Sequence, residues 1–269
     1  MKAGLPMKDG ISRIGVFDSG IGGLTVLKCL LEMIPGTDMV YLGDTARLPY
    51  GTKSPRTIVR YSIQCARFLV TQGIDMLVVA CNTASAHAIP ALREELDIPV
   101  VGVVEAGSRA AVETGAATIG VIGTSSTVAS RAYENTIHSL MPAARVVARA
   151  CPLFVPLVEE GWCADEITAM VARRYLKDLV SEGVETLLLG CTHYPLLKDV
   201  IQDIMGPGVL IVDSAYSTAC AVRDLVGLPG SPGAEPRVSF FLTDTSPRFV
   251  EIGARFLARE MTCVYDVDI

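Results

Sequence analysis

Two stretches of the sequence, 110 positions apart, follow one plan. Residues 73–83 (GIDMLVVACNT) and 183–193 (GVETLLLGCTH) each pass from a glycine through a short apolar run to a cysteine and polar residues. A second pair, residues 14–19 (IGVFDS) and 119–124 (IGVIGT), repeats with an offset of 105. Short runs rich in Val, Ile and Leu are typical of strands buried on both faces of a parallel sheet. The chain is therefore predicted to contain two copies of one strand–helix plan, and in each copy a central strand ends in a thiol.

The other apolar runs alternate with helical patterns. Ser54 followed by Pro55 predicts one helix start, Asp165 predicts another, and residues 24–33 have helical spacing. This alternation predicts an α/β fold with two pseudo-symmetric open sheets, mostly parallel and flanked by helices, with the active site in the cleft between the domains. Strands are expected at residues 14–17, 39–42, 74–80, 98–104, 118–122, 146–150, 187–189, 209–212 and 238–242.

The domain limits follow from the order of these elements. Those after residue 208 are too few to fold alone, so we expect them to return to the first domain, which then comprises residues 1–98 and 209–269. The second domain is predicted to comprise residues 99–208. Residues 151–156 (CPLFVP) are predicted to form a loop, because proline disfavours a helix interior, and residues 228–236 are expected to be a Gly/Pro-rich link.

Charge, hydropathy and cysteine usage exclude several classes of protein. A net charge of −6 disfavours nucleic acid as the main partner, because affinity for phosphate backbones needs concentrated Lys and Arg. Mean hydropathy is +0.42, yet no apolar run approaches the roughly 20 residues that span a bilayer. The N-terminus lacks the pattern of a signal peptide, so we expect a cytoplasmic protein whose eight cysteines are reduced. None of them forms a C-x-x-C pair, which argues against a zinc ribbon or a thioredoxin-like motif.

The two repeated cysteines, Cys81 and Cys191, are expected to be the reactive groups. Ligands of open α/β sheets bind outside the carboxyl ends of the strands, which is where both thiols are predicted to lie. Each also precedes a helix, whose N-terminus is expected to lower the pKa of the thiol and favour the thiolate. If the domains face each other, one thiolate can remove a proton from carbon while the opposite thiol returns one to the other face.

Polar neighbours complete the predicted site. His193 lies two residues after Cys191, and Asp18 is expected at a strand end near Cys81, so each can assist its nearer thiol. The alternatives are a buried hydrogen-bonded histidine, a helix-capping aspartate and two structural thiols. Hydroxyl and amide groups suitable for a polar, anionic ligand are provided by Ser19, Asn82, Thr83, Thr124 and Thr192.

These residues lie in motifs that resemble those of the glutamate racemase family. The matching segments are residues 17–23 (FDSGIGG), 49–51 (PYG), 80–84 (ACNTA), 157–161 (LVEEG) and 190–195 (GCTHYP). The resemblance extends over roughly residues 14–215 and implies interconversion of L- and D-glutamate without a cofactor or metal, which supplies D-glutamate for peptidoglycan. It also implies a homodimer, whose pairing mode the sequence leaves open.

The resemblance assigns roles residue by residue. It implies that Cys81 is the base for D-glutamate and Cys191 the base for L-glutamate, assisted by Asp18, Glu159 and His193. The implied substrate contacts are Asp18, Ser19, Tyr50, Gly51, Asn82, Thr83, Thr124, Thr192 and His193.

One departure and several alternatives remain at this stage. Ala106 stands where the family commonly has proline, at the expected hinge, which puts domain motion in doubt rather than chemistry. Related families act on aspartate, hydantoins or maleate. The sequence alone does not distinguish glutamate from aspartate, whose side chain is shorter by one methylene group. A non-catalytic amino-acid-binding regulator and a thiol redox protein are the competing functions.

Overall fold

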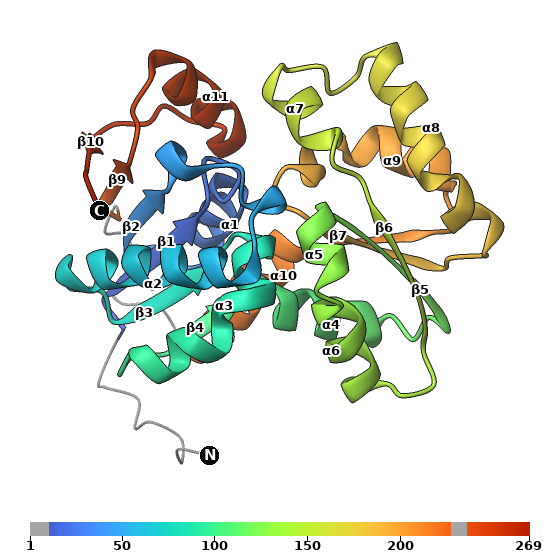
Figure 1. The fold of residues 1–269 in the computed structure, drawn as a ribbon, viewed down its shortest axis with the longest axis horizontal. Coiled ribbons are helices and arrows are strands. Elements are labelled where there is room, and N and C mark those ends of the chain that lie inside the picture. The colour runs from blue at the N-terminus through green and yellow to red at the C-terminus, as the bar shows by residue number, and fades with distance from the viewer. Residues whose placement is uncertain (1–10, 227–235) are drawn as a thin grey trace.

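The computed structural model describes residues 11–226 and 236–269, which form two parallel sheets that lie side by side (Figure 1). The first sheet has six strands and the second has four, and every strand pairing among these residues is parallel. The first has the order β10 (Val264–Asp266), β9 (Val238–Leu242), β2 (Asp38–Gly43), β1 (Arg13–Asp18), β3 (Met76–Val79), β4 (Val100–Gly102). The second has the order β6 (Arg145–Ala150), β5 (Thr118–Gly123), β7 (Thr186–Gly190), β8 (Leu210–Asp213). The predicted α/β class is confirmed.

The second sheet repeats the strand order of the first. Its strand order, β6-β5-β7-β8, corresponds to the order β2-β1-β3-β4 in the first sheet. In both sheets the strand that comes first in the sequence lies between the second and the third. All residues of β3 and β7 are buried, which explains their uninterrupted apolar sequences. The internal repeat in the sequence therefore corresponds to a repeat in the fold.

Eleven helices among the described residues flank the sheets. α2 begins after Ser54, whose hydroxyl accepts a hydrogen bond from Thr57 N–H, and α8 begins after Asp165, which caps Ile167 N–H. Both predicted caps are confirmed. The helices are α1 (Leu24–Met33), α2 (Pro55–Thr71), α3 (Asn82–Glu95), α4 (Val103–Glu113), α5 (Ser125–Ala129), α6 (Ala132–Leu140), α7 (Phe154–Glu159), α8 (Glu166–Ser181), α9 (Lys198–Met205), α10 (Ser214–Val226) and α11 (Pro247–Leu257).

The strands at the two predicted domain boundaries differ from the prediction. β4 was expected to open the second domain, but it pairs with β3 and belongs to the first sheet. β8 was expected in the first domain, but it pairs with β7 in the second sheet. A run of apolar residues predicts a strand without indicating its neighbour, so the chain crosses between the sheets a few residues later than expected in both places.

Two local predictions also differ from the structure. Residues 151–156 are not all loop, because α7 begins at Phe154 and has Pro156 in its first turn, where a missing N–H breaks no intrahelical bond. β10 was not predicted, since only three residues pair with β9 and two of them are exposed. The predicted link at residues 228–236 lies, apart from its last residue, outside the described residues.

One of the three buried apolar clusters among the described residues spans both halves. A single buried cluster includes Leu30 of α1, Ala219 of α10 and Leu189 of β7, so side chains from both sheets pack together. Within the described part of the chain, no helix has both the length and the apolar character needed to cross a membrane.

Candidate active site

A cavity of about 360 Å³ lies between the two sheets and is lined by residues from both. Its size is in the range of sites for small ligands. It brings together all the predicted site residues: Asp18, Ser19, Tyr50, Gly51, Cys81, Asn82, Thr83, Thr124, Glu159, Cys191, Thr192 and His193. The strand ends explain this convergence, because β1 ends at Asp18, β7 at Gly190, β5 at Gly123 and β3 two residues before Cys81.

Cys81 occupies the N-cap position of α3. Its sulfur accepts a hydrogen bond from Ala84 N–H at 3.4 Å, and its thiol donates to Ser19 Oγ at 3.3 Å. Burial, followed by the negative charge of Asp18, raises the pKa of Cys81 to about 12. The N–H of Ala84 at the helix N-terminus does lower this pKa, as expected, but desolvation outweighs it, so the prediction that the thiolate is favoured at Cys81 is wrong. Cys81 is a protonated thiol at neutral pH.

Cys191 has a different environment. Nδ1 of His193 lies 4.0 Å from its sulfur, and Nε2 of the same ring lies 3.0 Å from Glu159 Oε1 on α7. Burial disfavours the imidazolium, but hydrogen bonds and charges of Cys191 and Glu159 prevail and raise the pKa of His193 to about 10. A positive imidazolium beside Cys191 Sγ stabilises negative charge on that sulfur. The two thiols thus differ in their neighbours, a carboxyl group near Cys81 and an imidazole beside Cys191.

Two buried polar groups in the wall of the cavity have no protein partner among the described residues. Asp18 accepts a hydrogen bond from Gly20 N–H through Oδ2, while its Oδ1 is unpaired. Burial raises the pKa of Asp18 despite the nearby charge of His193. Asn82 accepts from Tyr133 through Oδ1, while its Nδ2 is unpaired. Unsatisfied buried polar atoms are rare in folded proteins, and these two lie in the cavity wall, where a polar ligand can pair with them.

Close contacts join the two halves across the cavity. The hydroxyls of Thr83 on α3 and of Thr124 before α5 share a hydrogen bond of 3.0 Å. A Cβ added to Gly22 would lie 2.3 Å from Thr192 Oγ1 and 2.5 Å from His193 Cε1. The glycine-rich turn after β1 is therefore packed directly against the motif that carries Cys191.

Some lining residues were not predicted. They include Ile21, Leu48, Thr52 and Val155. These apolar or small side chains lie within or close to the predicted motifs, and that position is their only signal in the sequence. His87 lies outside the cavity lining and shares a hydrogen bond with Ser126 Oγ at 3.0 Å. Among residues 11–226 and 236–269, no group of three or more His, Cys, Asp and Glu side chains is arranged to hold a metal ion.

The pKa of Cys81 leads to a prediction about its reactivity. Alkylation requires the thiolate, so its rate at Cys81 should keep rising about tenfold per pH unit beyond pH 9 and level off only near pH 12. Asp18→Asn removes a charge that raises this pKa and should accelerate alkylation of Cys81 at a fixed pH. Peptide mass spectrometry after iodoacetamide pulses measures the rate, with the exposed Cys263 as the reagent control. A plateau at Cys81 below pH 9 would contradict the assignment.

A family profile, related sequences and solved structures all match this chain to racemases. The profile described as Asp/Glu/Hydantoin racemase matches residues 14–223. A glutamate racemase of Geobacter metallireducens is 51% identical over 262 residues, covering 95% of this chain and 96% of the relative. A crystal structure of glutamate racemase from Francisella tularensis in complex with D-glutamate superposes with a TM-score of 0.89 at 38% identity, covering 95% of this chain and 97% of that one. The glutamate racemase of Aquifex pyrophilus gives 0.80 at 45% identity, covering 93% and 96%.

Proposed function

Because the chain belongs to the Asp/Glu/Hydantoin racemase family, we propose that it interconverts L- and D-glutamate by moving protons at Cα between Cys191 and Cys81. The observation that carries this proposal is that both thiols line one cavity, Cys81 just after β3 of the first sheet and Cys191 just after β7 of the second. Inversion at carbon needs one base and one acid at the same moment, on opposite faces of the substrate. In the proposed reaction from L-glutamate, Cys191 is the base and Cys81 is the acid.

The reaction follows from these states. With L-glutamate bound, the Cys191 thiolate takes the Cα proton, and the Cys81 thiol gives its proton to the opposite face of the carbanion. The C–H bond on the face of Cα toward Cys191 is broken, and a new C–H bond forms on the face toward Cys81. The product is therefore D-glutamate. Cys191 is left as the thiol and Cys81 as the thiolate, which is the state that accepts D-glutamate for the reverse reaction.

Neighbouring groups support each half of the transfer. His193, held by Glu159 at 3.0 Å, keeps a positive charge next to Cys191 and stabilises its thiolate. Burial and then the charge of Asp18 raise the pKa of Cys81, so the thiol there is a weak acid and its thiolate a strong base. Polar groups from Ser19, Asn82, Thr83, Thr124 and Thr192, with the Tyr50–Gly51 backbone, surround the space where the two carboxylates and the ammonium of glutamate would bind.

The substrate and the biological role rest on similarity. The relatives that match over 95% of this chain are glutamate racemases, so glutamate rather than aspartate is the proposed substrate. We propose that the D-glutamate supplies peptidoglycan synthesis in the cytoplasm, and that the enzyme is a homodimer.

The test is exchange of the Cα hydrogen by the purified protein in D2O without any added cofactor. Either enantiomer of glutamate should lose its Cα–H signal in proton NMR and reach a 1:1 mixture by chiral chromatography. Aspartate, run in parallel, should react far more slowly. The Cys81→Ala, Cys191→Ala double variant is the control, and glutamate racemisation by that variant would overturn the proposal.

A further inference from the structure

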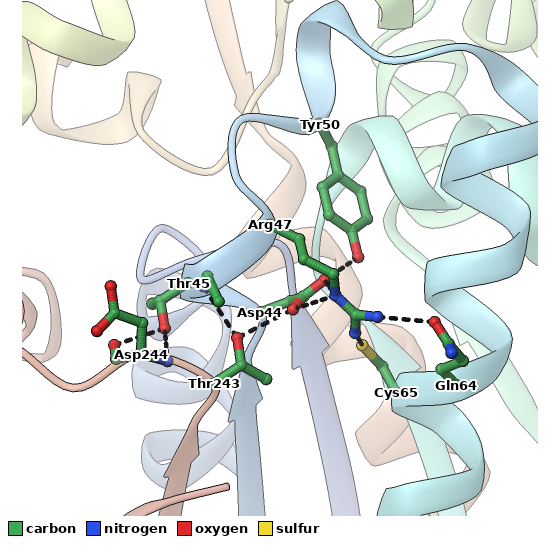
Figure 2. Close-up of polar contacts among 9 residues, drawn as sticks. Asp44, Thr45, Arg47, Tyr50, Gln64, Cys65, Thr243 and Asp244 are labelled. Atoms are coloured by element: carbon green, nitrogen blue, oxygen red, sulfur yellow. Dashed lines mark hydrogen bonds and ion pairs between the residues drawn. The ribbon is translucent and has the colours of Figure 1, made fainter. Parts of the chain in front are cut away.

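A cluster of polar side chains with a buried carboxylate at its centre joins the loop between β2 and α2 to α2 and to the segment after β9 (Figure 2). At its centre is Asp44, which follows the last residue of β2 and is fully buried. Its backbone N–H donates to Asp18 O at 3.0 Å, so it lies next to a residue of the proposed site. Nothing in the proposed chemistry uses its carboxylate.

Three donors converge on the two carboxylate oxygens of Asp44. Arg47 Nε lies 2.8 Å from both oxygens, the Tyr50 hydroxyl donates to Oδ2 at 2.5 Å, and the Thr243 hydroxyl donates to Oδ1 at 3.0 Å. A carboxylate accepts all of these bonds, whereas an amide would present an N–H group to at least one donor. The site is therefore built for a carboxylate rather than an amide.

Arg47 ties this carboxylate to α2. Its guanidinium donates to Gln64 Oε1 at 2.7 Å, lies 3.5 Å from Cys65 Sγ and stacks over the Tyr61 ring at 4.4 Å from the centroid. In Figure 2, Gln64 and Cys65 extend from α2 toward Arg47 on one side of Asp44. The Asp44–Arg47 ion pair is thus held in place by side chains of α2 and not only by the loop.

Residues 243 and 244, which follow β9, contact Asp44 and Thr45 from the other side. Thr243 Oγ1 donates to Asp44 and also accepts a hydrogen bond from Ala46 N–H at 2.9 Å. Thr45 Oγ1 donates to Asp244 O at 2.7 Å and accepts from Asp244 N–H at 2.8 Å. Residues almost 200 positions away in the sequence therefore clamp the start of the loop.

Tyr50 connects this cluster to the cavity. Its side chain is 1% exposed and its ring packs against Phe17, while residues 48–52 line the cavity. Burial raises the pKa of Tyr50 well above its ordinary value, so the phenol keeps the proton that it donates to Asp44. The next residue, Gly51, is so close to the second domain that an added Cβ would lie 3.0 Å from Thr124 Cβ.

We propose that Asp44 is a positioning residue for racemisation: by holding the Tyr50 hydroxyl, it fixes residues 48–52 as the wall of the cavity that closes against Thr124. This inference rests on the proposed function. Asp44 does not reach the cavity, so it acts on glutamate only through Tyr50 and Gly51. A cavity wall that contacts the bound substrate and the transition state equally stabilises both by the same amount. Its loss therefore raises KM and leaves kcat nearly unchanged.

The first test is Asp44→Asn in the full chain, with Asp38→Asn as the matched control. Asp38 begins the same strand and also pairs with an arginine, Arg237, but lies at the end of β2 away from the cavity. Asp44→Asn should raise KM roughly tenfold for both enantiomers and change kcat less than about threefold. Asp38→Asn should leave both constants unchanged. A variant that merely lowers the folded fraction would lose kcat at constant KM, and this outcome would overturn the positioning role.

Tyr50→Phe keeps the test decisive if Asp44→Asn does not fold. It removes only the hydroxyl that Asp44 holds, so it should raise KM in the same direction. Where Asp44→Asn does fold, the two effects should not multiply in the double variant. An unchanged KM in Tyr50→Phe, or fully multiplicative effects, would overturn the inference. Wild-type protein that is inactive toward glutamate would instead overturn the proposed function, and with it the premise for Asp44.

Discussion

Replacing either Cys81 or Cys191 with alanine is expected to lower kcat/KM for racemisation by at least about 10³-fold, near the upper end of what a positioned acid or base contributes. Each turnover needs both sulfurs, one as base and one as acid, so neither variant retains a functional pair. Initial rates from each pure enantiomer, followed by circular dichroism, give the measurement.

The two directions must be affected equally. The enantiomers have the same free energy, so their equilibrium constant is 1 and kcat/KM from the L side always equals that from the D side. A loss confined to one direction would therefore indicate an error in the assay. Cys263→Ala, at an exposed thiol that does not line the cavity, is the control and should retain full activity. Either active-site variant retaining a tenth of the wild-type rate would contradict the two-thiol account.

Gly22→Ala is expected to cause the second-largest loss, about 100-fold in kcat, because small displacements in an active site are costly. The added methyl group would lie 2.3 Å from Thr192 Oγ1 and 2.5 Å from His193 Cε1, so the motif that carries Cys191 must shift. That shift separates His193 from Glu159 or from the sulfur it supports. Steady-state kinetics and a thermal melt measure activity and folding separately.

Gly208→Ala is the matched control for this substitution. A Cβ at Gly208 meets no atom within 4 Å, so this variant should have wild-type kinetics. If Gly22→Ala folds and is fully active, the close packing between the glycine-rich turn and His193 is not required for catalysis.

The strand-end rule explains why the site residues could be predicted. Asp18, Cys81, Thr124 and Cys191 each come at or just after the end of a buried strand, and parallel strands place such residues at one edge of a sheet. The repeat in the sequence then predicts that the two edges are equivalent. That these four residues line one cavity follows from these two regularities, whereas Tyr50, Gly51 and Glu159 were implied only by the family resemblance.

Other features depend on contacts that sequence patterns do not contain. The pKa of Cys81 depends on burial, which outweighs the helix N-terminus, and burial was not predictable from the motif. Asp44 follows a strand as Asp18 does, but its partner Thr243 lies almost 200 residues away. The pairing of β8 was mispredicted for the same reason, because a strand's apolar run does not specify its neighbour.

The central claim is that Cys81 and Cys191 address opposite faces of one Cα, and exchange by the single variants in D2O tests it most directly. Cys191→Ala, which retains Cys81, should slowly replace the Cα hydrogen of D-glutamate with deuterium, without inversion, and leave L-glutamate untouched. Cys81→Ala should do the reverse. Proton NMR of each enantiomer with each variant gives the four rates. If both variants exchange the same enantiomer, the two sulfurs do not act on opposite faces and the account is wrong.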